Sequence, residues 1–293
     1  MPQPLISIVT PSFNQGKFLR AAMRSVLDQP DVAIEYVVMD GGSSDESPAI
    51  IREYEPRLHH WQSAPDSGHY AAINDGFSHC TGEIMAWLNS DDQYLPGALS
   101  IVAEIFSAFP EIEWLTTLFP LRWDERGRAI RCSPRRGYSR TAFLAGENLP
   151  LGRWHSEGCI QQETTFWRRS LWERSGAALD TRWKLAADFE LWARFYKHAE
   201  LYAVDAPLGG FRWHGNQRSN LQRETYEREA LEILKLAGGI LPSRLRSALR
   251  ATAAKHLPDR FRPLAHRSAL LHQSKVCTYL GAADGWKLAT VLH

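Results

Sequence analysis

The stretch IMAWLNSDD at residues 84–92 decides the fold class of this chain. Its five leading apolar residues are typical of a strand buried on both faces of a sheet, and turn residues with two carboxylates follow at once. The same apolar pattern predicts further strands at residues 5–10, 34–39, 59–62 and 112–117. Helical patterns separate these strands. The alternation predicts an α/β fold, Rossmann-like, with a mostly parallel central sheet flanked by helices.

The composition is that of a soluble globular protein, because 44% of the 293 residues are hydrophobic and 23% are charged. No stretch approaches the roughly 20 apolar residues that span a bilayer, and residues 1–10 lack the basic flank and cleavage site of a signal peptide. The four cysteines have no C-x-x-C spacing, so we expect neither a disulfide framework nor a zinc site. These features favour a cytoplasmic location.

The sequence patterns divide the chain into three segments. Residues 1–120 hold the alternating strands and helices. Residues 121–220 hold a predicted hairpin around 125–127, a long loop at 133–158 and further helices, and we expect this segment to be the second half of the same domain. Residues 221–293 are predicted to be a helical, basic C-terminal extension.

The charge of the extension differs from that of the body. Residues 241–293 hold nine Lys and Arg against two Asp and Glu, a net charge of +7, whereas the rest holds 25 against 31, a net charge of −6. Two interpretations stay open: the extension packs on the acidic body, or it attaches to an anionic membrane surface. The extension carries no recognised nucleic-acid-binding motif, so we expect no nucleic-acid partner.

Acidic residues follow three successive predicted strands, with Asp40 after the second, Asp66 after the third and the pair Asp91 and Asp92 after the fourth. In open α/β sheets, ligands bind outside the carboxyl ends of the strands. A single acid there is commonly a helix cap or a turn former, but clustered carboxylates repel one another unless a cation binds between them. The chain has no glycine-rich phosphate loop. A bound nucleoside diphosphate would therefore need Mg²⁺ or Mn²⁺ to bridge it to the carboxylates.

Three further polar positions have two interpretations each. Asp188 lies on the apolar side of a predicted helix at 185–197. It is either a general base or a buried, hydrogen-bonded acid. His214 is either a packed ring or a metal ligand. The polar run at 161–163 binds acceptor hydroxyls or forms a solvated strand edge. Glu190 precedes Arg194 by four residues, as in an ordinary exposed ion pair.

Seven short segments between residues 5 and 220 form a recognisable series. They are SIVTPSFN at 7–14, DGGSSD at 40–45, DSGHYAAINDG at 66–76, SDD at 90–92, QQETTFWRR at 161–169, ADFELW at 187–192 and FRWH at 211–214. In this order they resemble the motifs of the family-two inverting glycosyltransferases with the GT-A fold. The segment at 66–76 resembles a stretch in bacterial members that build surface polysaccharides.

The resemblance implies roles for the nucleotide-binding residues. It places Asp40 on the uracil or ribose of the donor, and Asp66 and Asn74 on the nucleotide side of the site. The wall of the base pocket would comprise Thr10, Pro11 and Phe13.

The resemblance also implies the metal and catalytic residues. Asp92 would ligate the Mn²⁺ or Mg²⁺ that bridges the diphosphate, with Asp91 on sugar or ribose hydroxyls, and Asp188 matches the catalytic base. His214 matches a histidine that reaches the metal or the diphosphate in some relatives. The motif is Ser-Asp-Asp and not a strict Asp-x-Asp, so position 90 adds no charge.

The implied function is transfer of a hexosyl or deoxyhexosyl group from a nucleotide-diphosphate sugar, foremost a UDP-sugar, to a saccharide or lipid-linked saccharide. A single displacement with one base inverts the anomeric carbon. Two other classes remain open. A nucleotidyltransferase would carry a glycine-rich loop with Lys or Arg after the first strand, which residues 10–16 lack. A non-catalytic nucleotide-sugar-binding protein could lose Asp188.

Overall fold

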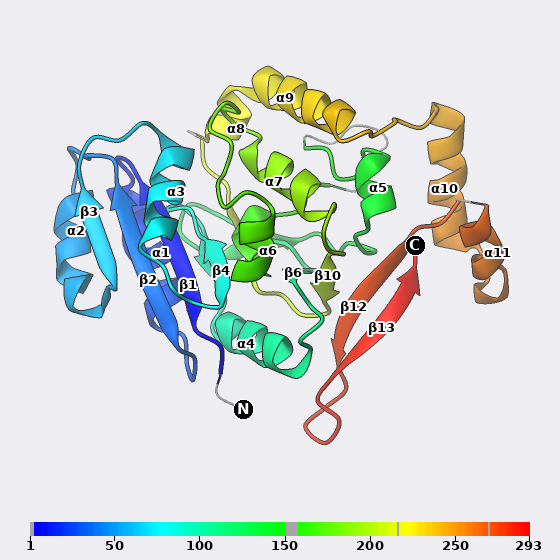
Figure 1. Ribbon diagram of the computed structural model, residues 1–293, viewed down its shortest axis with the longest axis horizontal. Helices are drawn as coiled ribbons and strands as arrows, with labels where there is room; N and C mark the ends of the chain where they lie inside the picture. The colour runs from blue at the N-terminus through cyan, green and yellow to red at the C-terminus, as the bar shows by residue number, and fades with distance from the viewer. Residues whose placement is uncertain (1–2, 151–157, 216, 269) are drawn as a thin grey trace.

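The computed structural model describes residues 3–150, 158–215, 217–268 and 270–293. A nine-stranded sheet forms its centre, in the order β13-β12-β10-β6-β9-β4-β1-β2-β3 (Figure 1). Strand β9 runs antiparallel to both of its neighbours and β13 runs antiparallel to β12, whereas all the other neighbouring pairs are parallel. The predicted mostly parallel sheet is confirmed. The strands are β1 (Ile6–Ser12), β2 (Ile34–Asp40), β3 (His60–Ser63), β4 (Ile84–Trp87), β6 (Trp114–Thr117), β9 (Phe166–Arg168), β10 (Tyr202–Val204), β12 (Gln273–Tyr279) and β13 (Trp286–Leu292).

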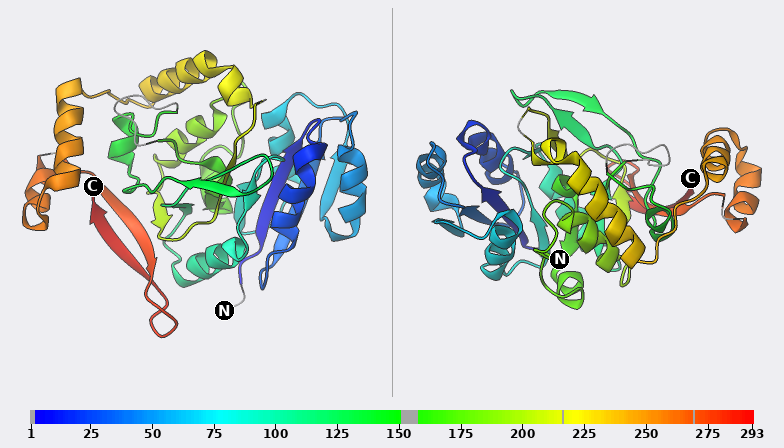
Figure 2. Two further views of the ribbon diagram at one scale, coloured as in Figure 1. Left: turned by 180° about the vertical axis from the view of Figure 1, so that it is seen from behind. Right: turned by 90° about the horizontal axis from the view of Figure 1, so that it is seen from above.

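Helices cover both faces of this sheet. Helices α3, α4, α6 and α7 lie on one face and α1 lies on the other (Figures 1 and 2). Gly76 brings α3 close to β1, because a Cβ at this position would lie 2.5 Å from Cγ1 of Val9. Pro48 opens α2 at a position where the missing N–H costs nothing. The helices are α1 (Gly16–Leu27), α2 (Ser47–Tyr54), α3 (His69–Ser78), α4 (Ala98–Ala108), α6 (Arg169–Arg174) and α7 (Ala187–Phe195).

Four buried tryptophans anchor α7 to the middle of the sheet. The ring of Trp192 on α7 stacks on Trp114 of β6 at 5.6 Å and on Trp87 of β4 at 6.1 Å, between ring centroids. Trp167 of β9 contacts Trp87 edge-on at 5.5 Å. This packing fixes the second half of α7 against β4 and β6.

A second sheet lies beside the carboxyl ends of the main strands. Its order is β5 (Gln93–Tyr94), β11 (Gly209–Arg212), β7 (Leu121–Trp123) and β8 (Ala129–Cys132). The predicted hairpin is confirmed as β7 and β8. Strands β5 and β9 and helix α5 (Arg140–Leu144) were not predicted, because they have only two to five residues each and leave no readable period.

The C-terminal extension contains helices, as predicted, namely α9 (Arg223–Leu236), α10 (Arg244–His256) and α11 (Arg262–Arg267), and the short α8 (Arg218–Leu221) precedes them. Strands β12 and β13, which were not predicted, follow these helices and extend the main sheet. Strand β12 pairs with β10, where Tyr202 lies opposite Lys275. No helix in the described ranges has the length and apolar content needed to cross a membrane.

Candidate active site

The loops after β1 and β2 are tied into one rigid ledge. The backbone N–H of Asn14 donates to Oγ of Ser43 at 2.7 Å, and the N–H of Ser44 donates to Oδ1 of Asn14 at 2.9 Å. Asp45 accepts from the N–H of Gly16 at 2.9 Å, at the start of α1. Asn14 adopts a φ of 52°, which asparagine tolerates better than most residues.

Asp40 supports this ledge from below. Its carboxylate is buried, and it accepts hydrogen bonds from the N–H of Ser43 at 2.9 Å, from Oγ of Ser43 at 2.5 Å and from Oγ of Ser63 at 2.6 Å. Asp40 fixes the loop at 41–45 through these hydrogen bonds. Its implied direct contact with the nucleotide stays a prediction.

The wall of the expected base pocket is smaller than the resemblance implied. Thr10 is buried and its Oγ1 accepts from the hydroxyl of Tyr36 at 2.9 Å, so it belongs to the core. Pro11 is buried as well, whereas 61% of Phe13 is exposed. Of the three wall residues, Phe13 alone presents its ring to a ligand.

Phe13 and Asp66 meet above Gly41. A Cβ on Gly41 would lie 2.9 Å from Oδ2 of Asp66 and 3.3 Å from Cδ2 of Phe13. Oδ1 of Asp66 accepts from the N–H of Gly68 at 2.7 Å, which directs the other oxygen toward Gly41. An exposed flat ring beside a carboxylate is a surface on which a nucleobase can stack and donate a hydrogen bond.

Asn74 has a different role from the one the resemblance implied. Its Nδ2 donates to the carbonyl of Leu179 at 2.9 Å and its Oδ1 accepts from the N–H of Leu179 at 2.7 Å. Both ends of the amide hold the loop that leads into α7. The implied contact with the nucleotide does not fit this arrangement.

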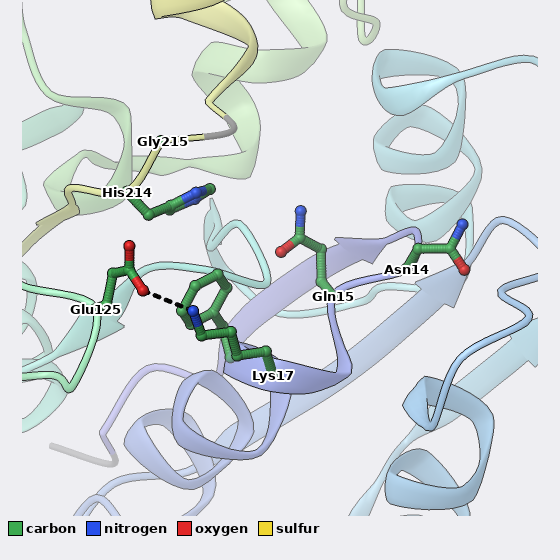
Figure 3. A pocket seen from close by; sticks show the side chains of 7 residues that line it. Asn14, Gln15, Lys17, Glu125, His214 and Gly215 are labelled. Carbon is green, nitrogen blue, oxygen red and sulfur yellow. Dashed lines mark hydrogen bonds and ion pairs between the residues drawn. The ribbon is translucent and has the colours of Figure 1, made fainter.

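Asp91 and His214 come together at the carboxyl end of β4. Oδ2 of Asp91 lies 2.9 Å from Nε2 of His214, and the buried histidine ring packs on Phe18 of α1 at 4.8 Å between centroids. A pocket of about 300 Å³ opens in front of His214 (Figure 3). Lys17 and Glu125 are joined across it by an ion pair of 2.6 Å. The pocket is lined by Asn14, Gln15, Lys17, Phe18, Glu125, His214 and Gly215.

Asp92 is fully buried behind this pair. Its Oδ1 accepts from the N–H of Arg212 at 2.8 Å and its Oδ2 accepts from Nδ2 of Asn89 at 3.1 Å. Burial, with the nearby charges of Asp91 and Glu163, raises the pKa of Asp92 well above its usual range. Each Asp92 oxygen accepts one hydrogen bond, which leaves a lone pair on each, so the assignment of the metal to Asp92 stays a prediction. Asp91, which reaches His214, is the more exposed carboxylate of the two.

Arg212 braces the site from within the protein, and the sequence analysis missed this role. Its buried guanidinium donates from Nε to the carbonyl of Asp91 at 2.5 Å, from Nη1 to the carbonyl of Glu125 at 3.1 Å and from Nη2 to Gln93 at 2.8 Å. Burial lowers its pKa. The sequence did carry a signal for this role, because Arg212 is a charged residue between two aromatic residues in a predicted strand.

Asp188 stands in the first turn of α7. Within the described part of the chain, its buried Oδ1 has no hydrogen-bond partner. Burial raises the pKa of Asp188 to about 6, although a hydrogen bond from Tyr226 opposes this shift. The ion pair of Glu190 with Arg194 is confirmed at 2.8 Å, but it is mostly buried and not exposed as expected.

The polar run at 161–163 lies at the floor of the site. Gln162 and Glu163 are buried, so the solvated-edge interpretation is wrong. Gln162 donates to the carbonyl of Trp87 and accepts from Asn89 at 3.2 Å. Oε1 of Glu163 is buried without a partner in the described ranges, and burial with the charges of Asp188 and Asp91 raises the pKa of Glu163 to about 8.

Comparisons with known proteins show the family of this chain. The family described as Glycosyl transferase family 2 matches residues 7–145. An uncharacterized glycosyltransferase of Mycobacterium tuberculosis is 30% identical over 188 residues, which cover 64% of this chain and 67% of the relative. The chain belongs to glycosyl transferase family 2. An uncharacterized glycosyltransferase of Rickettsia prowazekii is 27% identical over 228 residues, 76% of this chain and 70% of that relative.

Solved structures show the same fold for this family 2 glycosyltransferase. TarS of S. aureus, in complex with UDP-GlcNAc, has a TM-score of 0.59 at 15% identity, over 88% of this chain and 75% of TarS. The mannosyltransferase PcManGT from Pyrobaculum calidifontis, in complex with GDP-Man and Mn²⁺, has a TM-score of 0.52 at 17% identity, over 92% of this chain and 81% of that one. The expected GT-A-type fold is confirmed.

Proposed function

We propose that this glycosyltransferase moves a sugar from a nucleotide-diphosphate sugar to an acceptor hydroxyl with inversion, and that Asp188 is its general base. One observation carries the proposal. The charges of Asp91, which contacts His214, and of Asp188 both act on the buried Glu163, so the two carboxylates lie near the same side chain. A donor diphosphate held beside Asp91 would direct its anomeric carbon toward the base.

The donor end suits a divalent cation. Asp91 offers a hard oxygen and His214 a ring nitrogen, and Mg²⁺ or Mn²⁺ is commonly held by one or two protein ligands plus substrate phosphates. Within the described ranges no group of three or more His, Cys, Asp or Glu side chains is placed to hold a metal, so the donor's own phosphates would complete the shell. When bound, the cation offsets the charge on the departing nucleoside diphosphate. PcManGT, a relative in fold, carries Mn²⁺ with GDP-Man.

The nucleotide would lie on the ledge after β1 and β2. Phe13 offers a stacking face and Asp66 a hydrogen-bond acceptor beside Gly41. We infer a UDP-sugar as the donor, since the 40–45 motif resembles that of uridine-binding relatives and TarS binds UDP-GlcNAc in the same fold.

The chemical step needs one proton acceptor. Oδ1 of Asp188 has a free lone pair, and a pKa of about 6 leaves this carboxylate ionised at neutral pH yet basic enough to take the acceptor's proton. A single in-line displacement inverts the anomeric carbon, and it needs no second carboxylate as nucleophile. Burial keeps water away from the reacting atoms.

We further propose an acceptor in surface-polysaccharide or glycolipid synthesis, carried at the inner face of the plasma membrane. The 66–76 segment resembles bacterial enzymes of that kind. Helix α10 exposes Leu245 and Leu249 among arginines, which suits contact with an anionic bilayer.

Binding measurements with a panel of donors test the proposal. We expect UDP-sugars to raise the melting temperature with Mn²⁺ or Mg²⁺ and to lose this effect in EDTA. Nucleoside diphosphate should then be released from the bound donor. Release of pyrophosphate from UTP and a sugar 1-phosphate would instead identify a nucleotidyltransferase. Tight donor binding without turnover on any acceptor would favour a non-catalytic binding protein.

A further inference from the structure

The amides that lead into α7 are held by a residue from a distant helix. The first N–H groups of a helix have no partner within the helix itself. Here Glu229 of α9 accepts from the N–H of Lys184 at 3.1 Å, of Leu185 at 2.9 Å and of Ala186 at 3.2 Å. Glu229 is buried, so water does not compete for these hydrogen bonds.

The next residues surround the Asp188 carboxylate. Interactions with the backbone of Asp188 and Phe189 lower the pKa of this carboxyl. Tyr226, three residues before Glu229 on α9, lies close enough to lower it as well. Oδ1 of Asp188 is the acceptor that this arrangement leaves open. The free lone pair therefore has a fixed direction.

We propose that Glu229 and Tyr226 of α9 are positioning residues for Asp188. Glu229 holds the start of the helix that carries Asp188, and Tyr226 acts on the Asp188 carboxylate itself. This inference rests on the proposed function of Asp188. Helix α9 lies beyond residues 7–145, the part that matches the family. The C-terminal extension would thus complete the catalytic end of the site.

The two residues act on the base in opposite directions. A helix N-terminus lowers the pKa of a carboxylate in its first turn, and the negative charge of Glu229 counteracts this by raising the pKa of Asp188. The hydrogen bond from Tyr226 lowers it. The other ionisable groups whose charges interact with Asp188 are Tyr70 of α3, Cys159 and Glu163. None of these is changed in the variants below.

The titration of Asp188 can be measured directly, without any substrate. Protein labelled with ¹³C at aspartate carboxyl carbons is titrated by NMR, and the Asp188 signal is assigned by its loss in Asp188→Asn. We expect Tyr226→Phe to raise the midpoint and Glu229→Gln to lower it, each by about half a pH unit or more. Glu232→Gln, an exposed position on the same helix, is the matched control and should leave the midpoint unchanged.

Tyr226→Phe removes one oxygen and keeps the ring, so it decides the matter even if Glu229→Gln fails to fold. Unmoved midpoints in the folded variants, or shifts in the same direction, would overturn the positioning role. Turnover measurements distinguish a failure of the positioning role from a failure of the proposed function. If Asp188→Asn keeps wild-type turnover, Asp188 is not the base, and the inference falls with it. If turnover is lost but the midpoints of Tyr226→Phe and Glu229→Gln do not move, only the inference fails.

Discussion

Oδ2 of Asp91 lies 2.9 Å from Nε2 of His214, although 123 positions separate the two residues in the chain. The contact depends on the small second sheet, in which Gly210 of β11 pairs with Gln93 of β5 directly after the Asp91 turn. Arg212 then locks the two segments by its hydrogen bond to the Asp91 carbonyl. The proposed donor-binding centre thus combines the end of the first half of the domain with the end of the second.

Asp91→Asn and His214→Gln should each weaken Mn²⁺-dependent donor binding by at least about tenfold, because each removes one of two protein ligands. Their melting temperatures without metal should stay near wild type. Asp92→Ala should instead lower the stability by about 1–3 kcal/mol, because it leaves the N–H of Arg212 and the amide of Asn89 buried without their acceptor. Calorimetry with UDP and Mn²⁺, beside thermal melts, separates the two effects.

The opposite effects of these substitutions on metal-dependent binding would identify Asp92 as the metal ligand. In that case Asp92→Asn, which keeps the shape of the side chain, would abolish metal-dependent binding while Asp91→Asn retained it.

Asp188→Asn should leave donor affinity unchanged and lower kcat by roughly 10²–10⁴, since it keeps size and polarity but removes the base. In the wild type, kcat/KM should rise with pH through about 6, where the free Asp188 carboxyl ionises. The rising limb should be absent from the variant. Steady-state rates of nucleoside diphosphate release between pH 5 and 8 measure both. A variant with wild-type kcat would move the base to another residue.

Glu163→Gln should stabilise the protein at alkaline pH. Because the pKa of Glu163 is raised to about 8 in the fold from an ordinary value of 4.5, the folded state holds the proton more tightly than the unfolded state does. The stability tied to this proton is present below pH 4.5 and is lost as the pH rises through about 8.

Glutamine stays neutral throughout, so metal-free Glu163→Gln should match wild type near pH 4.5 and exceed it by on the order of 2–4 kcal/mol at pH 9. Urea denaturation at the two pH values measures this difference. Glu232→Gln, at an exposed position, serves as the control. Equal stability of Glu163→Gln and wild type at pH 9 would mean that Glu163 ionises normally in the fold.

The alternation of strands and helices in the first 120 residues could be predicted because each buried strand is a short apolar run followed by turn residues. Strands β12 and β13 were missed because the whole segment at 221–293 was predicted to be a helical extension. Gly281 and Gly285, both at positive φ, mark the turn between the two strands and were a usable signal.

The site was predicted less completely, for a different reason. A motif indicates which residue types gather, but burial decides which of them meets a ligand. Asp92 is covered because Arg212, 120 positions later, binds it. Asn74 is occupied by Leu179 of a loop 105 positions away. Such long-range contacts leave no trace in the local pattern.

The last prediction concerns helix α10, which turns its apolar side away from the protein. Arg250 is buried and pairs with the half-buried Glu147 at 3.0 Å. Leu245 and Leu249, four residues apart and so on one face of α10, are 71% and 52% exposed, and Leu241, just before the helix, is 39% exposed. Packing on the body explains the arginine but not the leucines. The helix and α11 project from one side of the body (Figure 1).

The charge around these leucines identifies the surface that they suit. Residues 241–268 hold seven Lys and Arg against one acidic residue, a net charge of +6, so two copies of this surface repel each other while an anionic bilayer attracts it.

Removing the extension is a poor test, because it would also delete β12 and β13 from the main sheet. Leu245→Ser with Leu249→Ser should instead weaken co-sedimentation with phosphatidylglycerol vesicles at least about tenfold, since two apolar side chains no longer enter the lipid. Ile130→Ser, at a 55% exposed position on β8, is the matched control and should bind as wild type does. High salt should weaken binding of all three proteins. Equal sedimentation of the double variant and wild type, or no sedimentation of wild type at low salt, would refute the membrane contact.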